Sequence, residues 1–114
     1  MPNTIKSAYT LCNNLTEAVW YVVQFWSVFA KTIVGNQLLN SLDNISINLA
    51  KAGKIKDSNR QILFLGDAAE YLIESFVWID KARRRSLFSK EEYQTFYLQM
   101  EKLETLLDKK RKRK

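Results

Sequence analysis

Hydrophobic residues recur along this chain at the three- and four-residue intervals of an α-helix, in four segments separated by short polar stretches. The second segment, about residues 32–52, has one apolar face formed by Leu38, Leu42, Ile45 and Leu49. Thr32 is the expected N-terminal cap of this helix, and Gly53 is the expected stop. Asn48 lies among apolar neighbours, so we expect its side chain to bond backbone or a neighbouring helix.

The third segment is expected to run from about Ser58 to Arg85, with Asp57 or Ser58 as its cap. Its apolar face is predicted to consist of Ile62, Leu65, Ala69, Leu72, Phe76 and Ile79. The fourth helix should start at Ser89, because Ser89 and Glu92 have the spacing of a capping box. Its predicted core stripe is Tyr93, Phe96, Met100, Leu103 and Leu107.

The first segment, about residues 5–28, differs because its apolar residues surround the helix instead of forming one stripe. Its β-branched and aromatic content is also compatible with strands, but it lacks strict alternation and hairpin residues, so we favour a helix. A four-helix bundle buries one face of each helix, and the surplus predicts a contact with another copy or a partner. We assign this expected interface to Trp20, Val22 and Trp26.

Short connections favour antiparallel neighbours, so the pattern predicts an all-α, antiparallel up-down four-helix bundle. We expect residues 1–108 to form the bundle domain and residues 109–114 to form a basic tail. In this topology the 52–57 loop and the tail lie at the same end. We call the cations gathered there the basic pole: Lys51, Lys54, Lys56, Arg60, Lys109, Lys110, Arg111, Lys112, Arg113 and Lys114. A secondary cluster of Arg83, Arg84 and Arg85, the arginine cluster, should lie at the opposite end.

Composition narrows the possible chemistry. The chain has 114 residues, no His, one Cys, three Gly and one Pro. We therefore expect no metal site, no cofactor and no catalytic constellation. The net charge of +6 equals the charge of the six basic residues at 109–114, and such a tail attracts nucleic acid or an acidic protein surface. A merely solubilising tail is the plainer alternative.

Targeting signals are not apparent in the sequence. The N-terminal residues lack the pattern of a signal peptide, and the most apolar stretch, residues 15–30, is short of a membrane span. We expect a cytoplasmic protein with no membrane partner.

The second segment also resembles a known family, through the pattern G-x-Q-L-x-x-x-x-D-x-I-x-x-N-I-A-E-G. The matching residues are Gly35, Gln37, Leu38, Asp43, Ile45, Asn48 and Ala50. The similarity continues through Phe64, Leu65, Ala68, Glu74, Trp78, Ala82, Arg83, Leu87 and Ser89, and covers about residues 30–93. The chain is thus similar to the four-helix-bundle family of proteins encoded in the intervening sequences of bacterial ribosomal RNA.

This resemblance implies a ring-like homo-oligomer, often a pentamer, without enzymatic activity. The family is also similar to the accessory variability determinant proteins of diversity-generating retroelements, which bind a reverse transcriptase and nucleic acid. The chain departs from the pattern at Lys51-Ala52, where the family has Glu-Gly, in the basic loop 53–56, and at Glu70, where the family has Gly. The first two departures add positive charge at the basic pole.

These observations lead to two functional hypotheses. The first is a non-enzymatic, homo-oligomeric adaptor that binds nucleic acid, RNA in preference, through phosphate contacts of its basic pole. The alternative is a protein-interaction module, such as an accessory subunit of a reverse transcriptase or another nucleic-acid enzyme. An enzyme is the third and least favoured class, because no nucleophile, base and orienting group are recognisable together.

Overall fold

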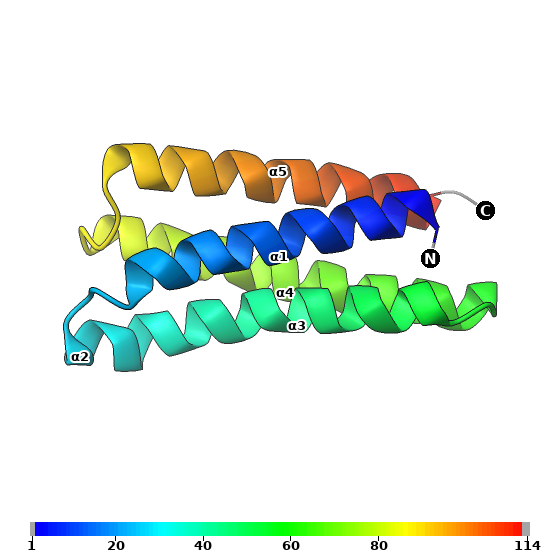
Figure 1. Ribbon diagram of the computed structural model, residues 1–114, viewed down its shortest axis with the longest axis horizontal. Helices are drawn as coiled ribbons and strands as arrows, with labels where there is room; N and C mark the ends of the chain where they lie inside the picture. The colour runs from blue at the N-terminus through cyan, green and yellow to red at the C-terminus, as the bar shows by residue number, and fades with distance from the viewer. Residues whose placement is uncertain (1, 113–114) are drawn as a thin grey trace.

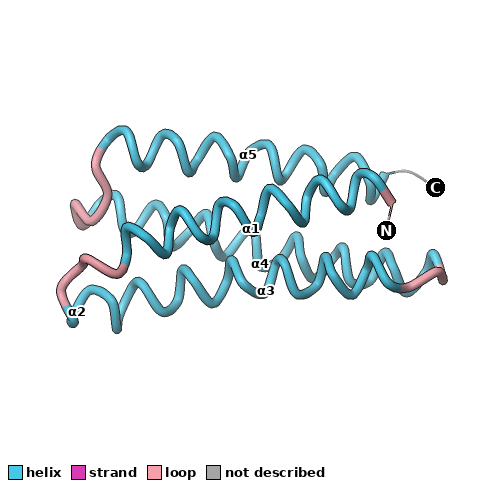
Figure 2. The backbone as a smooth tube through the Cα atoms, viewed as in Figure 1, coloured by secondary structure: helices cyan, strands magenta, loops and turns pink. Residues whose placement is uncertain are grey.

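The computed structural model describes residues 2–112, and these residues form an all-helical bundle of four long helices (Figure 1). The long helices are α1 (Asn3–Val23), α3 (Asn36–Lys54), α4 (Ser58–Arg84) and α5 (Lys90–Lys112). A single turn, α2 (Val28–Ala30), and a π-helical turn, η1 (Lys31–Gly35), lead directly into α3. Loops are confined to the two ends of the bundle (Figure 2).

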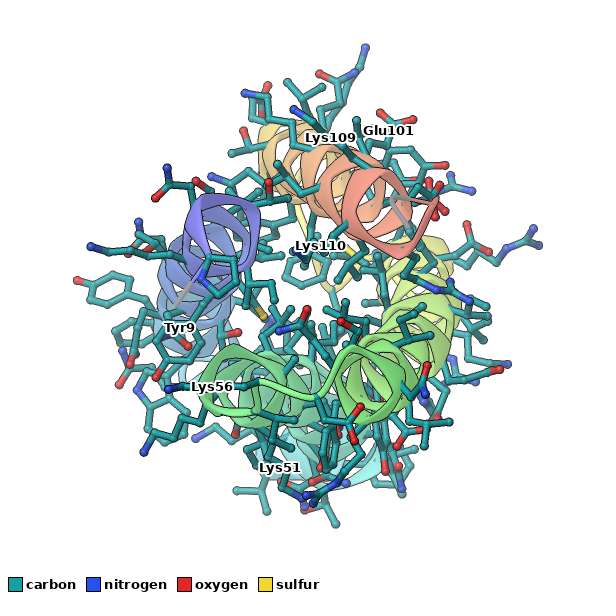
Figure 3. The ribbon with its side chains drawn as sticks, turned by 90° about the vertical axis from the view of Figure 1, so that its right-hand side faces the viewer. Tyr9, Lys51, Lys56, Glu101, Lys109 and Lys110 are labelled. Atoms are coloured by element: carbon teal, nitrogen blue, oxygen red, sulfur yellow. The ribbon has the colours of Figure 1, made fainter. Side chains whose placement is uncertain are left out.

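The helices pack as the up-down topology predicts. Each long helix contacts its two neighbours in the order α1, α3, α4, α5 and back to α1. Seen end-on, the flank formed by α1 and α3 is therefore opposite the flank formed by α4 and α5 (Figure 3). The N-terminus, the α3–α4 loop and the end of α5 lie at one end of the molecule (Figure 1).

The core lies where the apolar spacing predicts it. Leu38, Leu42, Ile45 and Leu49 of α3 are fully buried, and so are Met100 and Leu103 of α5. On α4 only Leu65, Leu72 and Ile79 of the predicted stripe are fully in the core. The expectation of a core position is wrong for Ile62, which is exposed, and for Ala69, while Phe76 is only partly buried against the core. The buried face of α4 is completed instead by Ala68, Ser75 and Ala82. These small side chains are weak signals in a hydrophobic pattern, so half of the predicted stripe lies one residue away from the true core positions.

Local side-chain bonds fix the starts of α4 and α5. The Asp57 carboxylate accepts a hydrogen bond from the Asn59 N–H at 2.9 Å, and Ser89 and Glu92 form the predicted capping box with bonds of 3.1 and 2.8 Å. Asn48 is buried, and its Nδ2 donates to the Asn44 carbonyl at 2.9 Å, which confirms the expected structural bond.

Two boundaries differ from the prediction at the turn between α1 and α3. The first helix ends at Val23 instead of reaching Val28, so Trp26 lies in the connection and not on α1. The next helical turn, α2, is capped by Ser27, whose Oγ accepts the Ala30 N–H at 3.1 Å. Thr32 lies inside the helical run, and its Oγ1 donates to the Val28 carbonyl. Thr32 is therefore not the cap.

Two further ends also shift. Helix α3 continues to Lys54, one residue beyond Gly53. At this end of α3, the Gln61 side-chain amide of α4 donates hydrogen bonds to the Ala52 and Ile55 carbonyls. Helix α5 continues to Lys112, so the first four residues of the predicted tail extend the helix. Arg113 and Lys114 lie outside the described residues.

Candidate nucleic-acid interface

The candidate site is built from two elements that end at the same pole. The end of α3, the loop after it and the first turn of α4 carry Lys51, Lys54, Lys56 and Arg60. The last turn of α5 carries Lys109, Lys110, Arg111 and Lys112. Lys6, which was not among the predicted site residues, is also at this end because α1 starts there (Figure 1). The up-down topology alone would have been sufficient to include it.

The cations form a rim around the end of the bundle instead of one compact patch. Lys51 and Lys56 lie by α3 at the lower side of the end-on view, whereas Lys109 lies across the bundle on α5 (Figure 3). Lys110 lies between them, near the bundle axis, and is partly buried. A polyanion that crosses this end can therefore contact both halves of the rim.

Up to Arg111, the cations of the basic pole have no carboxylate partner. Between Lys6 and Arg111, none of the pole's cations forms an ion pair. The Asp57 carboxylate is occupied by the helix cap of α4. Lys51 instead places its ammonium 5.6 Å from the centre of the Phe64 ring, a cation–π contact that leaves its charge available.

The arginine cluster at the other pole is electrostatically different. Asp80 accepts hydrogen bonds from Arg84 at 2.8 Å and from Arg83 at 3.2 Å. The Arg84 guanidinium, followed by that of Arg83, holds the pKa of Asp80 below its usual value. Arg83 also lies 5.2 Å from the centre of the Tyr93 ring. Two of the three arginines are therefore already engaged within the protein.

The three residues assigned to an oligomer interface lie in different environments. Trp20 is exposed on α1. Val22 and Trp26 are partly buried against the bundle's own core, and the Trp26 ring packs edge-on against Phe88 with centroids 5.2 Å apart. Three residues outside this assignment are far more exposed than Val22 and Trp26: Phe25, Val28 and Phe29. They follow Val23, where the chain leaves the helix.

The single thiol belongs to the core. Cys12 is fully buried, and its Sγ lies 3.5 Å from the Leu42 carbonyl oxygen. Burial raises the pKa of this thiol to about 12, against a smaller lowering by the hydrogen bond with Thr16. Since the thiolate is the reactive form, Cys12 is a packing residue at neutral pH.

The class of protein that these observations define is a basic, all-helical four-helix bundle. No helix within residues 2–112 combines the length and apolar character needed to cross a bilayer. No protein-family model matches the chain, and no curated protein matches it.

Proposed function

We propose that this protein is a non-enzymatic, homo-oligomeric adaptor that binds nucleic acid, RNA in preference, at its basic pole. The observation that carries the proposal is the rim of cations from α3, α4 and α5 without carboxylate partners. Phosphates bind such cations with release of condensed counterions. The sequence has no recognised base-reading motif, which favours contacts that do not depend on nucleotide sequence.

Assembly is part of the same proposal. A ring-like homo-oligomer, with a pentamer as the expected number, would repeat the basic pole in every copy. Several weak phosphate-binding sites on one particle bind a long polyanion far more tightly than one site does. The apolar side chains exposed on the bundle support an assembled state.

The test compares two variants that each lose three cations. One replaces Lys54, Lys56 and Arg60 by Gln at the basic pole, and the control replaces Arg83, Arg84 and Arg85 by Gln at the other pole. Binding to a mixed-sequence single-stranded RNA and to a DNA duplex is measured by fluorescence anisotropy at several salt concentrations. The logarithmic salt slope should fall by about 0.7 per lost contact for the single strand and about 0.9 for the duplex.

The basic-pole variant should lose affinity and slope, and the arginine-cluster control should lose much less. Removal of residues 109–114 should act in the same direction as the basic-pole variant and equally for all sequences. Absence of binding to either nucleic acid at low salt would contradict the proposal. Equal losses in both variants would contradict the placement of the site.

A protein partner is the second candidate, because unpaired cations also complement an acidic protein surface. A reverse transcriptase or another nucleic-acid enzyme is the expected partner of this kind. A gene for a reverse transcriptase beside the gene for this chain would favour it, and co-purification of the two proteins after nuclease treatment tests it directly.

A further inference from the structure

Two apolar surfaces remain exposed on the bundle, and they lie on opposite flanks. The first is at the turn from α1 to α3, where Trp20, Tyr21, Phe25, Val28, Phe29 and Ile33 are exposed; we call it the aromatic corner. The second runs along α4 and the groove between α4 and α5, and includes Leu63, Ile73 and Val77; we call it the α4 groove.

The aromatic corner is large enough to require a partner. Trp20, Tyr21, Phe25 and Phe29 are 56, 66, 75 and 77% exposed. With about 150–250 Å² for a whole aromatic side chain, these four alone leave roughly 400–700 Å² in solvent. A stable interface needs about 800 Å² from each partner, and Val28 and Ile33 bring the corner close to that area.

The α4 groove has the shape and chemistry to receive such a surface. Two adjoining depressions of about 470 and 310 Å³ share Phe76 and Asp80. The larger one lies on α4 and is also lined by Val77, Lys81 and Arg84. The smaller one lies between α4 and α5 and is also lined by Tyr93, Tyr97, Glu101 and Glu104. Phe76, Val77, Tyr93 and Tyr97 give this lining an apolar and aromatic part on which aromatic rings can pack.

The corner and this part of the groove also lie at the same height along the bundle. The turn after α1 is at the same end as the last turns of α4 and the start of α5 (Figure 1). Two copies placed side by side in the same orientation therefore bring the corner of one against the groove of the next. Because the two surfaces lie on opposite flanks, one copy can offer its corner to one neighbour and its groove to another at the same time.

We propose that the aromatic corner of one copy docks into the α4 groove of the next, in a head-to-tail contact between parallel copies. The inference rests on the homo-oligomer of the proposed function, and it names the two surfaces that form it. Since all copies point the same way, every basic pole lies on one side of the assembly. A contact of this type closes into a ring when the rotation between copies divides a full turn.

The experiment uses two variants in solvent-exposed side chains. The corner variant carries Phe25→Asp and Phe29→Asp, and the groove variant carries Ile73→Asp and Val77→Asp. Ile47→Asp on α3 is the matched control, because Ile47 is 48% exposed but belongs to neither surface. Masses are measured by sedimentation and native mass spectrometry without nucleic acid, and circular dichroism checks that each variant is folded.

The intact chain and the Ile47→Asp control should be oligomers, and the two charge variants should be monomers. An equimolar mixture of the two variants should form a 1:1 heterodimer and nothing larger, since only one intact corner and one intact groove can meet. A monomeric intact chain, or dissociation of only one of the two variants, would overturn the head-to-tail contact. A mixture that stays monomeric although both variants are folded would overturn it as well.

These outcomes are separate from the nucleic-acid test. Loss of the heterodimer with binding at the basic pole retained contradicts only the docking surfaces. A normal heterodimer from a protein that binds no nucleic acid contradicts only the proposed function.

Discussion

Gly35 shows how one missing side chain sets the geometry of the turn between the first two long helices. A Cβ built on Gly35 would lie 2.7 Å from Cγ1 of Val23 and 3.8 Å from the Trp26 ring. The backbone of Gly35 is helical, so the glycine is required by close approach and not by its conformation. Gly66 on α4 is the opposite case, since a Cβ there would meet nothing within 4 Å.

The pair predicts opposite effects of one substitution. Gly66→Ala should raise the free energy of unfolding by about 0.5–1 kcal/mol, because alanine favours a helix. Gly35→Ala gains the same helix preference but must displace Val23, and overpacking of this kind costs about 1–3 kcal/mol. Urea denaturation of both variants checks the difference. If Gly35→Ala proves as stable as Gly66→Ala, the close approach is wrong.

At the scale of helix pairs, the contact between α1 and α3 carries a carboxylate that opposes folding. Partial burial raises the pKa of Asp43 on α3, and the negative charge of Glu17 on α1 raises it further. A carboxyl group whose pKa is higher in the folded state binds its proton more tightly there. The contribution of Asp43 to the free energy of unfolding is therefore most favourable at low pH, and it falls as the pH rises through the pKa of the folded state.

Asp43→Asn should consequently stabilise the protein at pH 7, by up to about 1 kcal/mol for a partly exposed pair of charges. The gain should disappear near pH 3, below the ordinary range for aspartate, because the carboxyl is then neutral in both states. Urea denaturation at several pH values measures it. Glu17→Gln should give part of the gain, and the two substitutions together should give less than their sum. A gain that is independent of pH would contradict the electrostatic explanation.

At the scale of the whole molecule, the proposed assembly of parallel copies would turn a weak phosphate-binding site into a strong one. Each copy presents a rim of cations at one end, and an assembly with aligned poles presents several such rims to one polyanion. Binding through several rims gains effective concentration, which can raise the affinity on the order of 10²–10⁴-fold over one rim.

The monomeric groove variant should therefore bind a long RNA much more weakly than the intact protein. It should bind a short RNA, which spans one pole only, with nearly the same affinity as the intact protein. Titrations with RNAs of two lengths test this, with Ile47→Asp as the control that keeps the assembly. Equal affinity of the groove variant and the intact protein for the long RNA would show that one copy supplies the whole site.

The four helices, most of the core and the placement of both charged clusters can be predicted from the sequence. Helical spacing and caps such as Ser89–Glu92 and Asp57 act within a few residues, so they can be recognised without a structure. The basic pole followed from short connections and alternating helix direction.

Only the packing of distant segments determines where α1 ends, how the chain turns after α4, which cations stay unpaired, and which apolar residues remain in solvent. Ser86 adopts a left-handed φ of 59° at the end of α4, where glycine is usual, and the Leu87 N–H bonds the Ala82 carbonyl at 2.9 Å. The next residue, Phe88, is buried in the core. Likewise, Trp26 packs on Phe88 while Phe25 faces solvent. Apolar residues in a turn carry no periodicity, so only packing between distant segments decides which of them the core takes.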